Sequence, residues 1–387
     1  MSVLPPLSLY IHVPWCVRKC PYCDFNSHES QGDIPEADYI SALIEDLKQD
    51  LHWVQGREIQ SIFFGGGTPS LLSARAYDTL FDGLTRHLSF SDNIEITLEA
   101  NPGTFEAEKF NGYRRAGINR LSMGIQSFDP EQLKKLGRIH DKEQALRAID
   151  MARDAGFDNF NLDLMYGLPN QTPEQALLDL DTALAFHPPH LSWYQLTIEP
   201  NTDFYKRPPV LPEDDILWDI QEQGQARLAE AGLKQYEISA YARPGRQARH
   251  NINYWRFGDY LGIGAGAHGK ITIAGPEGHR VLRSQKARLP KRYLDETRQF
   301  LSATDIIASD DIAFECMMNA LRLHSGISIT DFEQRTGVTL DSLSKPMQKA
   351  ESLGLIERAQ VNNQDYIRAS ERGKQYLNEL LSLFLTD

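Results

Sequence analysis

Three of the four cysteines lie within eight residues near the start of the chain. Cys16, Cys20 and Cys23 follow the pattern C-x3-C-x2-C, whereas Cys316 is far away in the sequence. A disulfide framework usually distributes an even number of cysteines along a short secreted chain, which is not the pattern here. The crowded thiols therefore indicate a metal or cluster site in a reducing compartment. Cys316 lies in an apolar helical segment, where we expect an inert core residue.

Three thiolates at this spacing fit more than one kind of centre. They could hold three irons of a [4Fe–4S] cube and leave the fourth iron open, since thiolates are the usual ligands of such clusters. A zinc ion is the alternative, with His12 or His28 as the fourth ligand, in a zinc-stabilised protein without a redox role. Chance clustering is the third explanation. The spacing alone favours the cluster.

The first 240 residues alternate strand-like and helix-like segments, which predicts parallel strands joined by right-handed crossovers. Six such units indicate a partial (β/α)6 barrel, with an open doubly wound sheet as the alternative. The expected strands are 7–13, 61–64, 95–100, 121–126, 160–165 and 191–198, with a short further strand at 235–240. The expected helices are 36–53, 71–88, 104–116, 142–155, 172–186 and 214–232.

Both architectures place ligands at the C-terminal ends of the strands, and the chemically informative residues fall there. The cysteine loop follows the first expected strand, and three glycines at 65–67 follow the second. Glycines let the backbone approach a ligand closely, although the same run also fits a tight turn. Each polar residue alone is more often structural, so their shared rim is what indicates a site. These polar residues are Glu99, Gln126, Arg138 and Asp163.

The remainder of the chain divides into two further segments. Residues 241–256 contain four arginines and no acidic residue, a glycine-rich stretch continues to 269, and 270–310 has the composition of a linker. The glycines of this stretch lack the rest of a dinucleotide-binding fingerprint. The last 77 residues predict helices, a hairpin and a final helix, in the order of a winged helix. We therefore expect a barrel at 1–240, a middle segment and linker at 241–310, and a small C-terminal winged-helix-like domain at 311–387.

Charge and hydropathy exclude several classes of protein. The chain has 40 basic and 53 acidic side chains, for a net charge of −13, which argues against broad phosphate contacts with nucleic acid. No apolar run reaches the roughly 20 residues that a membrane span needs. The first ten residues carry neither the basic segment nor the cleavage site of a signal peptide. We expect a soluble cytoplasmic protein.

The cysteine loop, with an aromatic Tyr22 before its last cysteine, resembles that of the radical S-adenosylmethionine (SAM) superfamily. The resemblance implies that Cys16, Cys20 and Cys23 ligate a [4Fe–4S] cluster whose open iron binds the amino and carboxylate groups of SAM. It also implies that an electron from the cluster can cleave SAM into methionine and a 5′-deoxyadenosyl radical.

Within this superfamily, nearly the whole chain resembles the oxygen-independent coproporphyrinogen III oxidase group. The oxidases carry a further cysteine two residues after the third, and Phe25 takes that position here. Phe25 argues against oxidase activity, and oxidative decarboxylation of coproporphyrinogen III is the alternative function. The resemblance implies a SAM pocket formed by Tyr10, Tyr22, Gly66, Gly67, Thr68, Glu99, Gln126, Arg138 and Asp163.

Residues 250–255, with the sequence HNINYW, place an imidazole beside two aromatic rings and close to the four arginines. Such a set could bind haem through an axial histidine, ring contacts and arginine–propionate pairs, although a structural histidine is the commoner explanation from composition alone. The motif H-N-x-x-Y-W resembles the signature of HemW-type haem chaperones. This resemblance implies haem delivery to acceptor haemoproteins, including respiratory proteins, with peripheral contact at the inner face of the membrane. It implies His250 as the haem ligand, in a site shaped by Asn251, Tyr254 and Trp255.

Overall fold

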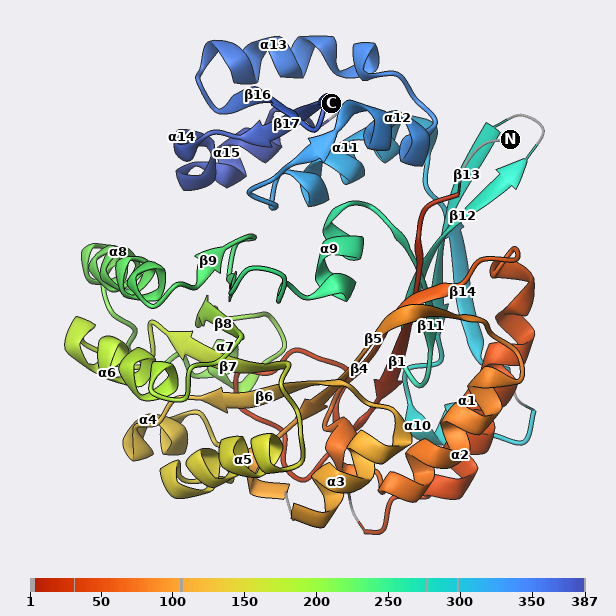
Figure 1. The fold of residues 1–387 in the computed structure, drawn as a ribbon, viewed down its shortest axis with the longest axis vertical. Helices are drawn as coiled ribbons and strands as arrows, with labels where there is room; N and C mark the ends of the chain where they lie inside the picture. Colours follow the sequence, from red (N-terminus) through yellow and green to blue (C-terminus); the bar gives the residue numbers. More distant parts are fainter. Residues whose placement is uncertain (1–3, 31, 105–106, 276–277, 298, 386–387) are drawn as a thin grey trace.

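The computed structural model describes residues 4–30, 32–104, 107–275, 278–297 and 299–385. Within these ranges, twelve strands form one continuous sheet, which is flanked by helices and carries a smaller domain beside it (Figure 1). The strand order is β14-β13-β12-β11-β1-β4-β5-β6-β7-β8-β10-β9.

The centre of this sheet is a run of six parallel strands that neighbour one another in chain order. This order contains no reversal of direction along the sheet, so it is that of a partial barrel and not of a doubly wound sheet. The expected partial (β/α)6 barrel is therefore confirmed. The strands are β1 (Leu7–Val13), β4 (Ile59–Gly66), β5 (Phe90–Ala100), β6 (Arg120–Gln126), β7 (Phe160–Tyr166) and β8 (His190–Gln195).

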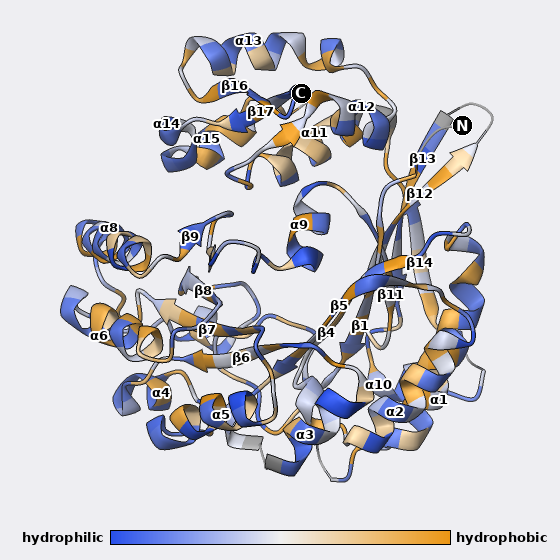
Figure 2. Ribbon diagram, in the orientation of Figure 1, coloured by the Kyte–Doolittle hydropathy of each residue, from blue (hydrophilic) through white to orange (hydrophobic). Residues whose placement is uncertain are grey.

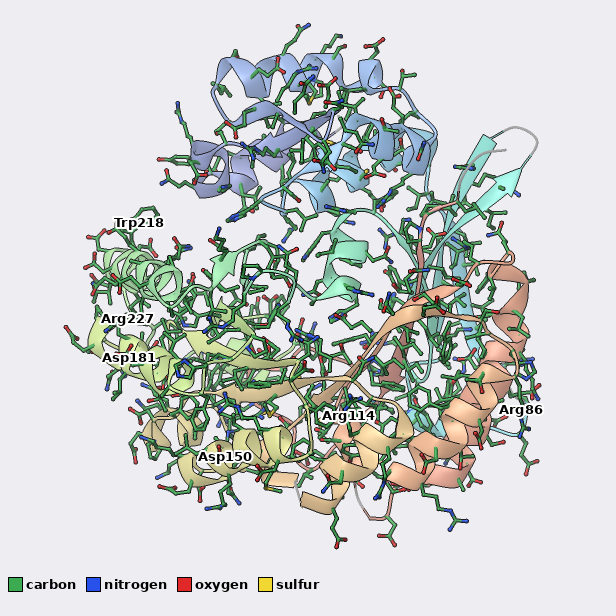
Figure 3. The ribbon with its side chains drawn as sticks, in the orientation of Figure 1. Arg86, Arg114, Asp150, Asp181, Trp218 and Arg227 are labelled. Atoms are coloured by element: carbon green, nitrogen blue, oxygen red, sulfur yellow. The ribbon has the colours of Figure 1, made fainter. Side chains whose placement is uncertain are left out.

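Amphipathic helices cover the outer face of the barrel, and each carries both hydrophobic and hydrophilic residues (Figure 2). Their starts are set by capping side chains: Asp141 and Thr172 each form a capping box with the glutamine three residues later. At the outer surface, α6 and α8 are joined by an ion pair of 2.9 Å between Asp181 and Arg227 (Figure 3). The helices are α1 (Glu36–Asp50), α2 (Ala74–Thr85), α3 (Ala107–Ala116), α4 (Pro130–Lys135), α5 (Lys142–Asp154), α6 (Pro173–Leu184), α7 (Asp203–Lys206) and α8 (Asp214–Glu230). Residues 105–106 of the expected helix at 104–116 lie outside the described residues.

The segment 270–310 is not a linker, and this prediction was wrong. Beyond β1, the parallel strand β11 (Asp259–Ile263) is followed by three antiparallel strands that extend the sheet. Their mixture of glycine, lysine, arginine and serine hides the strand pattern, and the strands are stabilised by pairing with one another. They are β12 (His268–Gly275), β13 (Gly278–Lys286) and β14 (Leu301–Ile306), and α10 (Pro290–Tyr293) precedes the last of them. Residues 276–277 and 298 of this segment lie outside the described residues.

The opposite edge of the sheet also differs from expectation. The single strand expected at 235–240 is two short antiparallel strands, β9 (Lys234–Gln235) and β10 (Ala240–Ala242), because the chain turns back on itself between them. The HNINYW motif then lies on a short helix, α9 (Arg249–Trp255). Figure 1 shows α9 between the sheet and the C-terminal domain.

Within the described residues, the C-terminal domain is built on five helices and a three-stranded sheet, and three helices, a hairpin and the final helices follow one another in the order expected for a winged helix. Its core is separate from that of the barrel and contains the fully buried Cys316. Burial raises the pKa of the Cys316 thiol to about 12, as fits an inert core residue. The elements are α11 (Ser309–Ala320), β15 (Ile327–Ser328), α12 (Ile329–Thr336), α13 (Ser344–Ser352), β16 (Ile356–Val361), β17 (Gln364–Ala369), α14 (Glu371–Gln375) and α15 (Leu377–Ser382).

In the described parts of the chain, no helix combines the length and the apolar composition that crossing a bilayer requires.

Candidate functional site

The cysteine loop leaves the C-terminal end of β1 and is closed by a short pair of parallel strands. β2 (Trp15–Cys16) pairs with β3 (His28–Glu29), and Cys23 N donates to the Cys20 carbonyl at 3.1 Å, which makes a turn between the two cysteines. Cys16, Cys20 and Cys23 are all free thiols, and all three line a cavity of about 480 Å³. The cavity lies at the C-terminal ends of the barrel strands, where a ligand site was expected.

The two histidines considered as a fourth zinc ligand differ: His12 is fully hydrogen-bonded, whereas the buried Nε2 of His28 has no hydrogen-bond partner in the described structure. In the described residues, no three His, Cys, Asp or Glu side chains converge on one metal position, as the four ligands of zinc do. Both ring nitrogens of His12 are engaged, by the Tyr10 hydroxyl at 2.8 Å and the Asn26 carbonyl at 2.9 Å. His12 therefore cannot be a fourth ligand without losing these bonds. In a cluster, each of the three thiolates would bind a different iron, so the thiols do not have to converge on one metal position.

A buried arginine places positive charge beside the thiols. Arg138 Nη1 donates to Cys20 Sγ at 3.5 Å, and its other terminal nitrogen donates to the Gly124 carbonyl at 2.8 Å and to Asn101 Oδ1. Burial raises the pKa of Cys16, although the Thr68 hydroxyl acts in the opposite direction. A guanidinium in this position would offset the negative charge of a thiolate-bound cluster.

The glycines after β4 let the backbone pack directly against the cysteine loop. A Cβ on Gly67 would overlap the Trp15 carbonyl oxygen, and a Cβ on Gly66, where φ is +113°, would overlap the His12 ring. Thr68 N donates to the same Trp15 carbonyl at 2.7 Å. The glycines are therefore needed for packing against the cysteine loop, whereas their close approach to a ligand stays a prediction.

Glu99 is a carboxylate in the cavity that has no cationic partner among the described residues. It accepts a hydrogen bond from Gly66 N at 3.3 Å. Burial, with a further contribution from the charge of Asp163, raises the pKa of Glu99 to about 8. A bound ligand that carries an ammonium group would supply the missing charge and favour the carboxylate.

The other polar residues expected at the rim also face this cavity. Asp163 accepts hydrogen bonds from Ser122 Oγ and Asn161 Nδ2, each at 2.8 Å, which leaves acceptor capacity for a hydroxyl. Gln126 has a positive φ of 63° at a bulge between β6 and β7, and its buried Oε1 lacks a hydrogen-bond partner in the described structure. Strained backbone and an unpaired polar atom at a strand end are typical of a ligand site. Tyr22 lines the cavity as well.

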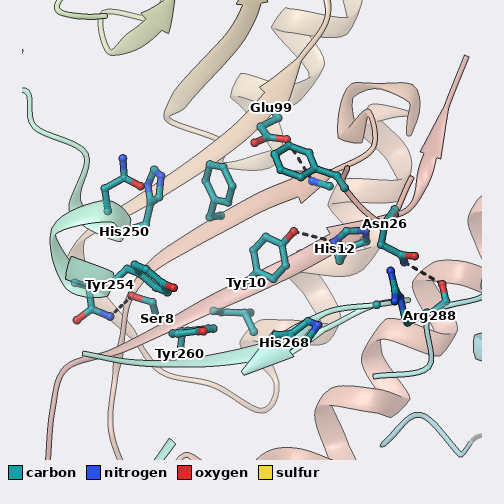
Figure 4. Close-up of a pocket in the computed structure, with 17 residues that line it drawn as sticks. Ser8, Tyr10, His12, Asn26, Glu99, His250, Tyr254, Tyr260, His268 and Arg288 are labelled. Atoms are coloured by element: carbon teal, nitrogen blue, oxygen red, sulfur yellow. Dashed lines mark hydrogen bonds between the residues drawn. The ribbon is translucent and has the colours of Figure 1, made fainter. Parts of the chain in front are cut away.

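Tyr10 is the exception among the expected SAM residues. It does not line the cavity of the cysteines, and its ring stacks on Phe63 with 6.1 Å between the ring centroids. It lines a second cavity, of about 550 Å³, which adjoins the first (Figure 4). The two cavities share Phe25, Phe63, Gly66, Glu99, His250 and Asn251.

The second cavity has walls of aromatic rings. Tyr10, Phe63, Tyr254 and Tyr260 contribute rings, and Phe25 lies at the border with the first cavity. Phe25 is 59% exposed, at the position where the oxidases have their additional cysteine. A flat apolar ligand fits such a cavity, because aromatic rings bind other rings by stacking and by edge contacts.

His250 projects from α9 at the border of the two cavities and is held from behind by Glu95. Its Nδ1 lies 2.8 Å from Glu95 Oε1, and its ring stacks on Phe63 with a centroid separation of 4.3 Å. Glu95 also accepts the backbone N–H groups of Arg249 and His250, so it caps the start of α9.

The protonation states of this pair follow from these contacts. Burial lowers the pKa of His250, although Glu95 acts against it, so the imidazole is neutral at neutral pH. Burial alone would raise the pKa of Glu95, but the hydrogen bond from His250 and the other contacts outweigh it and lower that pKa to about 2. The ionised carboxylate can only accept, which assigns the proton to Nδ1. Nε2 is left with a lone pair and has no partner among the described side chains.

Two expectations for this region were wrong. Trp255 lines neither cavity but packs between α9 and the C-terminal domain, with Arg322 5.4 Å from its ring centroid. A two-turn helix presents neighbouring side chains in different directions, so Tyr254 faces the cavity and Trp255 does not.

The four arginines of 241–256 also face away from both cavities. Arg246 pairs with Asp158 at 3.1 Å on the surface. Arg249 donates to the Asn93 carbonyl. The arginine that does line the second cavity is Arg288, from a segment that the sequence did not single out. His268 lines it too.

Sequence comparisons agree with this geometry. Residues 10–183 match the Radical SAM superfamily, and residues 307–376 match the HemN C-terminal domain. A "Heme chaperone HemW" from Escherichia coli (strain K12) is 53% identical over 387 residues, and one from Haemophilus influenzae is 53% identical over 391 residues; both comparisons cover all of each chain. A third, from Bacillus subtilis, is 34% identical and covers 98% of this chain and 99% of its own.

Among solved structures, the radical SAM enzyme coproporphyrinogen III oxidase (HemN) from Escherichia coli superimposes with a TM-score of 0.81 at 25% identity, over 98% of this chain and 90% of its own. The barrel and its cysteine loop thus define a radical SAM protein, and this superfamily implies a [4Fe–4S] cluster and SAM. Because the identity reaches 53% over the whole chain, the protein belongs to the HemW family. The family expected from the motifs is confirmed.

Proposed function

We propose that this protein is a haem chaperone that binds haem through His250 Nε2 and passes it to acceptor haemoproteins. The observation that carries the proposal is the hydrogen bond of 2.8 Å between His250 Nδ1 and Glu95, which leaves the other ring nitrogen free at a cavity walled by aromatic rings. Metal-binding histidines commonly donate their second ring N–H to a carboxylate, which fixes the tautomer and makes the ligand more basic.

The second cavity supports haem as the ligand. Its volume of about 550 Å³ is in the range usual for small-molecule sites. The rings of Tyr10, Phe63 and Tyr260 offer flat apolar contacts, and Tyr254 and Asn251 bring the motif residues to the same cavity. The printed names of the HemW relatives support the same ligand.

The first cavity supports a cluster and SAM beside the haem. Cys16, Cys20 and Cys23 would hold the [4Fe–4S] cluster, which supplies one-electron chemistry when bound. Arg138 would offset the negative charge of the thiolate-bound cluster. The remaining roles are those of the polar rim: Glu99 would pair with the ammonium group of SAM, Asp163 would accept from its ribose hydroxyls, and Tyr22, Gly66, Gly67, Thr68 and Gln126 would complete the pocket.

We extend the proposal to acceptors of the respiratory chain, with peripheral contact at the inner face of the membrane. The resemblance to the HemW signature at 250–255 supports this extension.

The second candidate function is oxygen-independent decarboxylation of coproporphyrinogen III. The TM-score of 0.81 with the HemN oxidase over 98% of the chain favours it. Phe25, in place of the additional cysteine of the oxidases, argues against it.

Haem titration of the reconstituted protein tests the proposal. We expect wild-type protein to bind one haem with a distinct Soret band, His250→Ala to lose it, and His52→Ala, which changes an exposed histidine, to retain it. The iron–sulfur absorbance after anaerobic reconstitution should be the same in all three proteins. Equal haem binding by His250→Ala would contradict the proposal, and formation of a vinyl porphyrinogen from coproporphyrinogen III would favour the oxidase. Reconstitution without iron–sulfur absorbance would favour zinc.

A further inference from the structure

One end of the second cavity is electropositive, and the proposed function does not use it. Arg288 lines this end, and Figure 4 shows it on the far side of Tyr10 and Tyr260 from His250. His268 lines the same end. Besides its burial, the positive charge of Arg288 lowers the pKa of His268, which shows that the two groups interact.

Arg288 forms no ion pair with an acidic side chain among the described residues. Glu99 is the one acidic side chain among the described residues that line the cavity, and it contacts Gly66 at the border with the first cavity. Because burial raises the pKa of Glu99 to about 8, it contributes little negative charge at neutral pH. The guanidinium at this end therefore lacks a counter-charge from the cavity wall.

The backbone around Arg288 is fixed by the cysteine loop. Asn26 Nδ2 donates to the Arg288 carbonyl at 2.9 Å and to the Ala265 carbonyl at 3.0 Å. Gly266 permits this contact, because a Cβ there would overlap the Asn26 amide. His268 begins β12 and is paired in register with Gln285 on β13. Arg288 lies at an exposed bend between β13 and α10, and His268 is exposed as well, but the backbone that carries each of them is held by these contacts.

We propose that Arg288, with His268 as a second donor, binds a carboxylate group of the ligand whose metal is held by His250. A guanidinium presents two parallel N–H groups that match a carboxylate, which makes such pairs both strong and directional. This inference rests on the proposed haem site and adds the direction in which the ligand lies in the cavity. The ring would lie along Tyr10 and Tyr260, with one acidic side group directed to Arg288. Arg288 thus takes the carboxylate-binding role that the sequence suggested for the four arginines of 241–256, none of which lines either cavity.

A comparison of haem with its dimethyl ester tests this directly, because the ester keeps the iron and the ring but loses both charges. Wild-type protein should bind haem about 10- to 100-fold more tightly than the ester, the effect expected for a hydrogen bond between charged groups. Arg288→Gln should bind haem about 10- to 100-fold more weakly than wild type does, but should bind the ester with wild-type affinity. The variant would then bind haem and its ester about equally. Arg288→Lys, which keeps the charge but not the two parallel N–H groups, should fall between them.

Arg246→Gln is the matched control, since it removes the same charge from an arginine that lines neither of the two cavities. It should keep the preference for haem over the ester. Equal weakening of both ligands in Arg288→Gln, or no preference in wild type, would overturn the carboxylate proposal while haem binding through His250 stands. Wild-type protein that binds neither ligand would instead overturn the haem site itself, and this inference with it. Iron–sulfur absorbance reports whether each variant is folded.

Discussion

Glu95 on β5 and His250 on α9 are 155 positions apart in the chain and meet at 2.8 Å. The same carboxylate receives two backbone N–H groups at the start of α9, so one buried side chain sets both the position of the helix and the tautomer of the histidine. The lone pair on Nε2 is a consequence of this pairing, because an ionised carboxylate cannot donate.

The first prediction concerns Glu95→Gln. We expect haem affinity to fall by about 10- to 100-fold, the usual cost of losing the carboxylate behind a metal-binding histidine. Glutamine has nearly the same shape but keeps one acceptor oxygen instead of two, so the loss reports both the charge and the second acceptor of the carboxylate. Haem titration measures it, with Glu58→Gln on the surface as the control. Unchanged affinity in a folded Glu95→Gln protein would show that His250 is positioned without this carboxylate.

Much of the barrel could be predicted because its signals are local. The alternation of strands and helices identified the six barrel strands β1 and β4 to β8, although not the parallel strand β11 beside them, and the spacing of Cys16, Cys20 and Cys23 is contained in one loop. The strands β12 to β14 could not be recognised in the same way, since their residues are only weakly strand-like and pairing across the sheet stabilises them.

The haem-site residues show a second limit of sequence analysis. His250 was recognised by its motif, but neither Glu95 nor Arg288 is close to it in sequence, and no local pattern connects them. Trp255 was assigned to the wrong side because the orientation of a two-turn helix is fixed by what it packs on, here Leu323 and Arg322 of the C-terminal domain. An acid within a strand, such as Glu95 in the middle of β5, becomes a signal only once the helix that it contacts is known.

The second prediction follows from the pKa of Glu99, about 8 in the folded protein against about 4.3 for an ordinary glutamate. Between these values the folded state holds more protons than the unfolded state, so the free energy of unfolding should fall as the pH rises from 5 to 8. Glu99→Gln removes this contribution. We expect wild type to lose on the order of 1 kcal/mol or more relative to the variant across this range. Urea unfolding at pH 5, 6.5 and 8, without SAM, measures the difference, and parallel pH profiles would contradict it.

The third prediction is that Gly67→Ala lowers the iron content. The added methyl group would overlap the Trp15 carbonyl, so the backbone of β2 must shift, and Cys16 with it. Iron and sulfide analysis after reconstitution should show less than half of the wild-type content, whereas Gly32→Ala, where a Cβ meets nothing within 4 Å, should match wild type. Full cluster content in Gly67→Ala would show that the loop tolerates the shift.

The fourth prediction concerns the charge that Arg138 places 3.5 Å from Cys20 Sγ. Reduction adds an electron to the cluster, so a nearby positive charge stabilises the reduced form and raises the reduction potential. Arg138→Gln should therefore lower the potential, by about 40 mV or more, since 1 kcal/mol corresponds to about 40 mV for a one-electron couple. A redox titration followed by electron paramagnetic resonance measures this shift. Arg138→Lys keeps the charge and should restore most of the potential, and Arg86→Gln, at the outer surface (Figure 3), should leave it unchanged. A wild-type potential in Arg138→Gln would mean that this guanidinium acts only through its hydrogen bonds to the Gly124 carbonyl and Asn101.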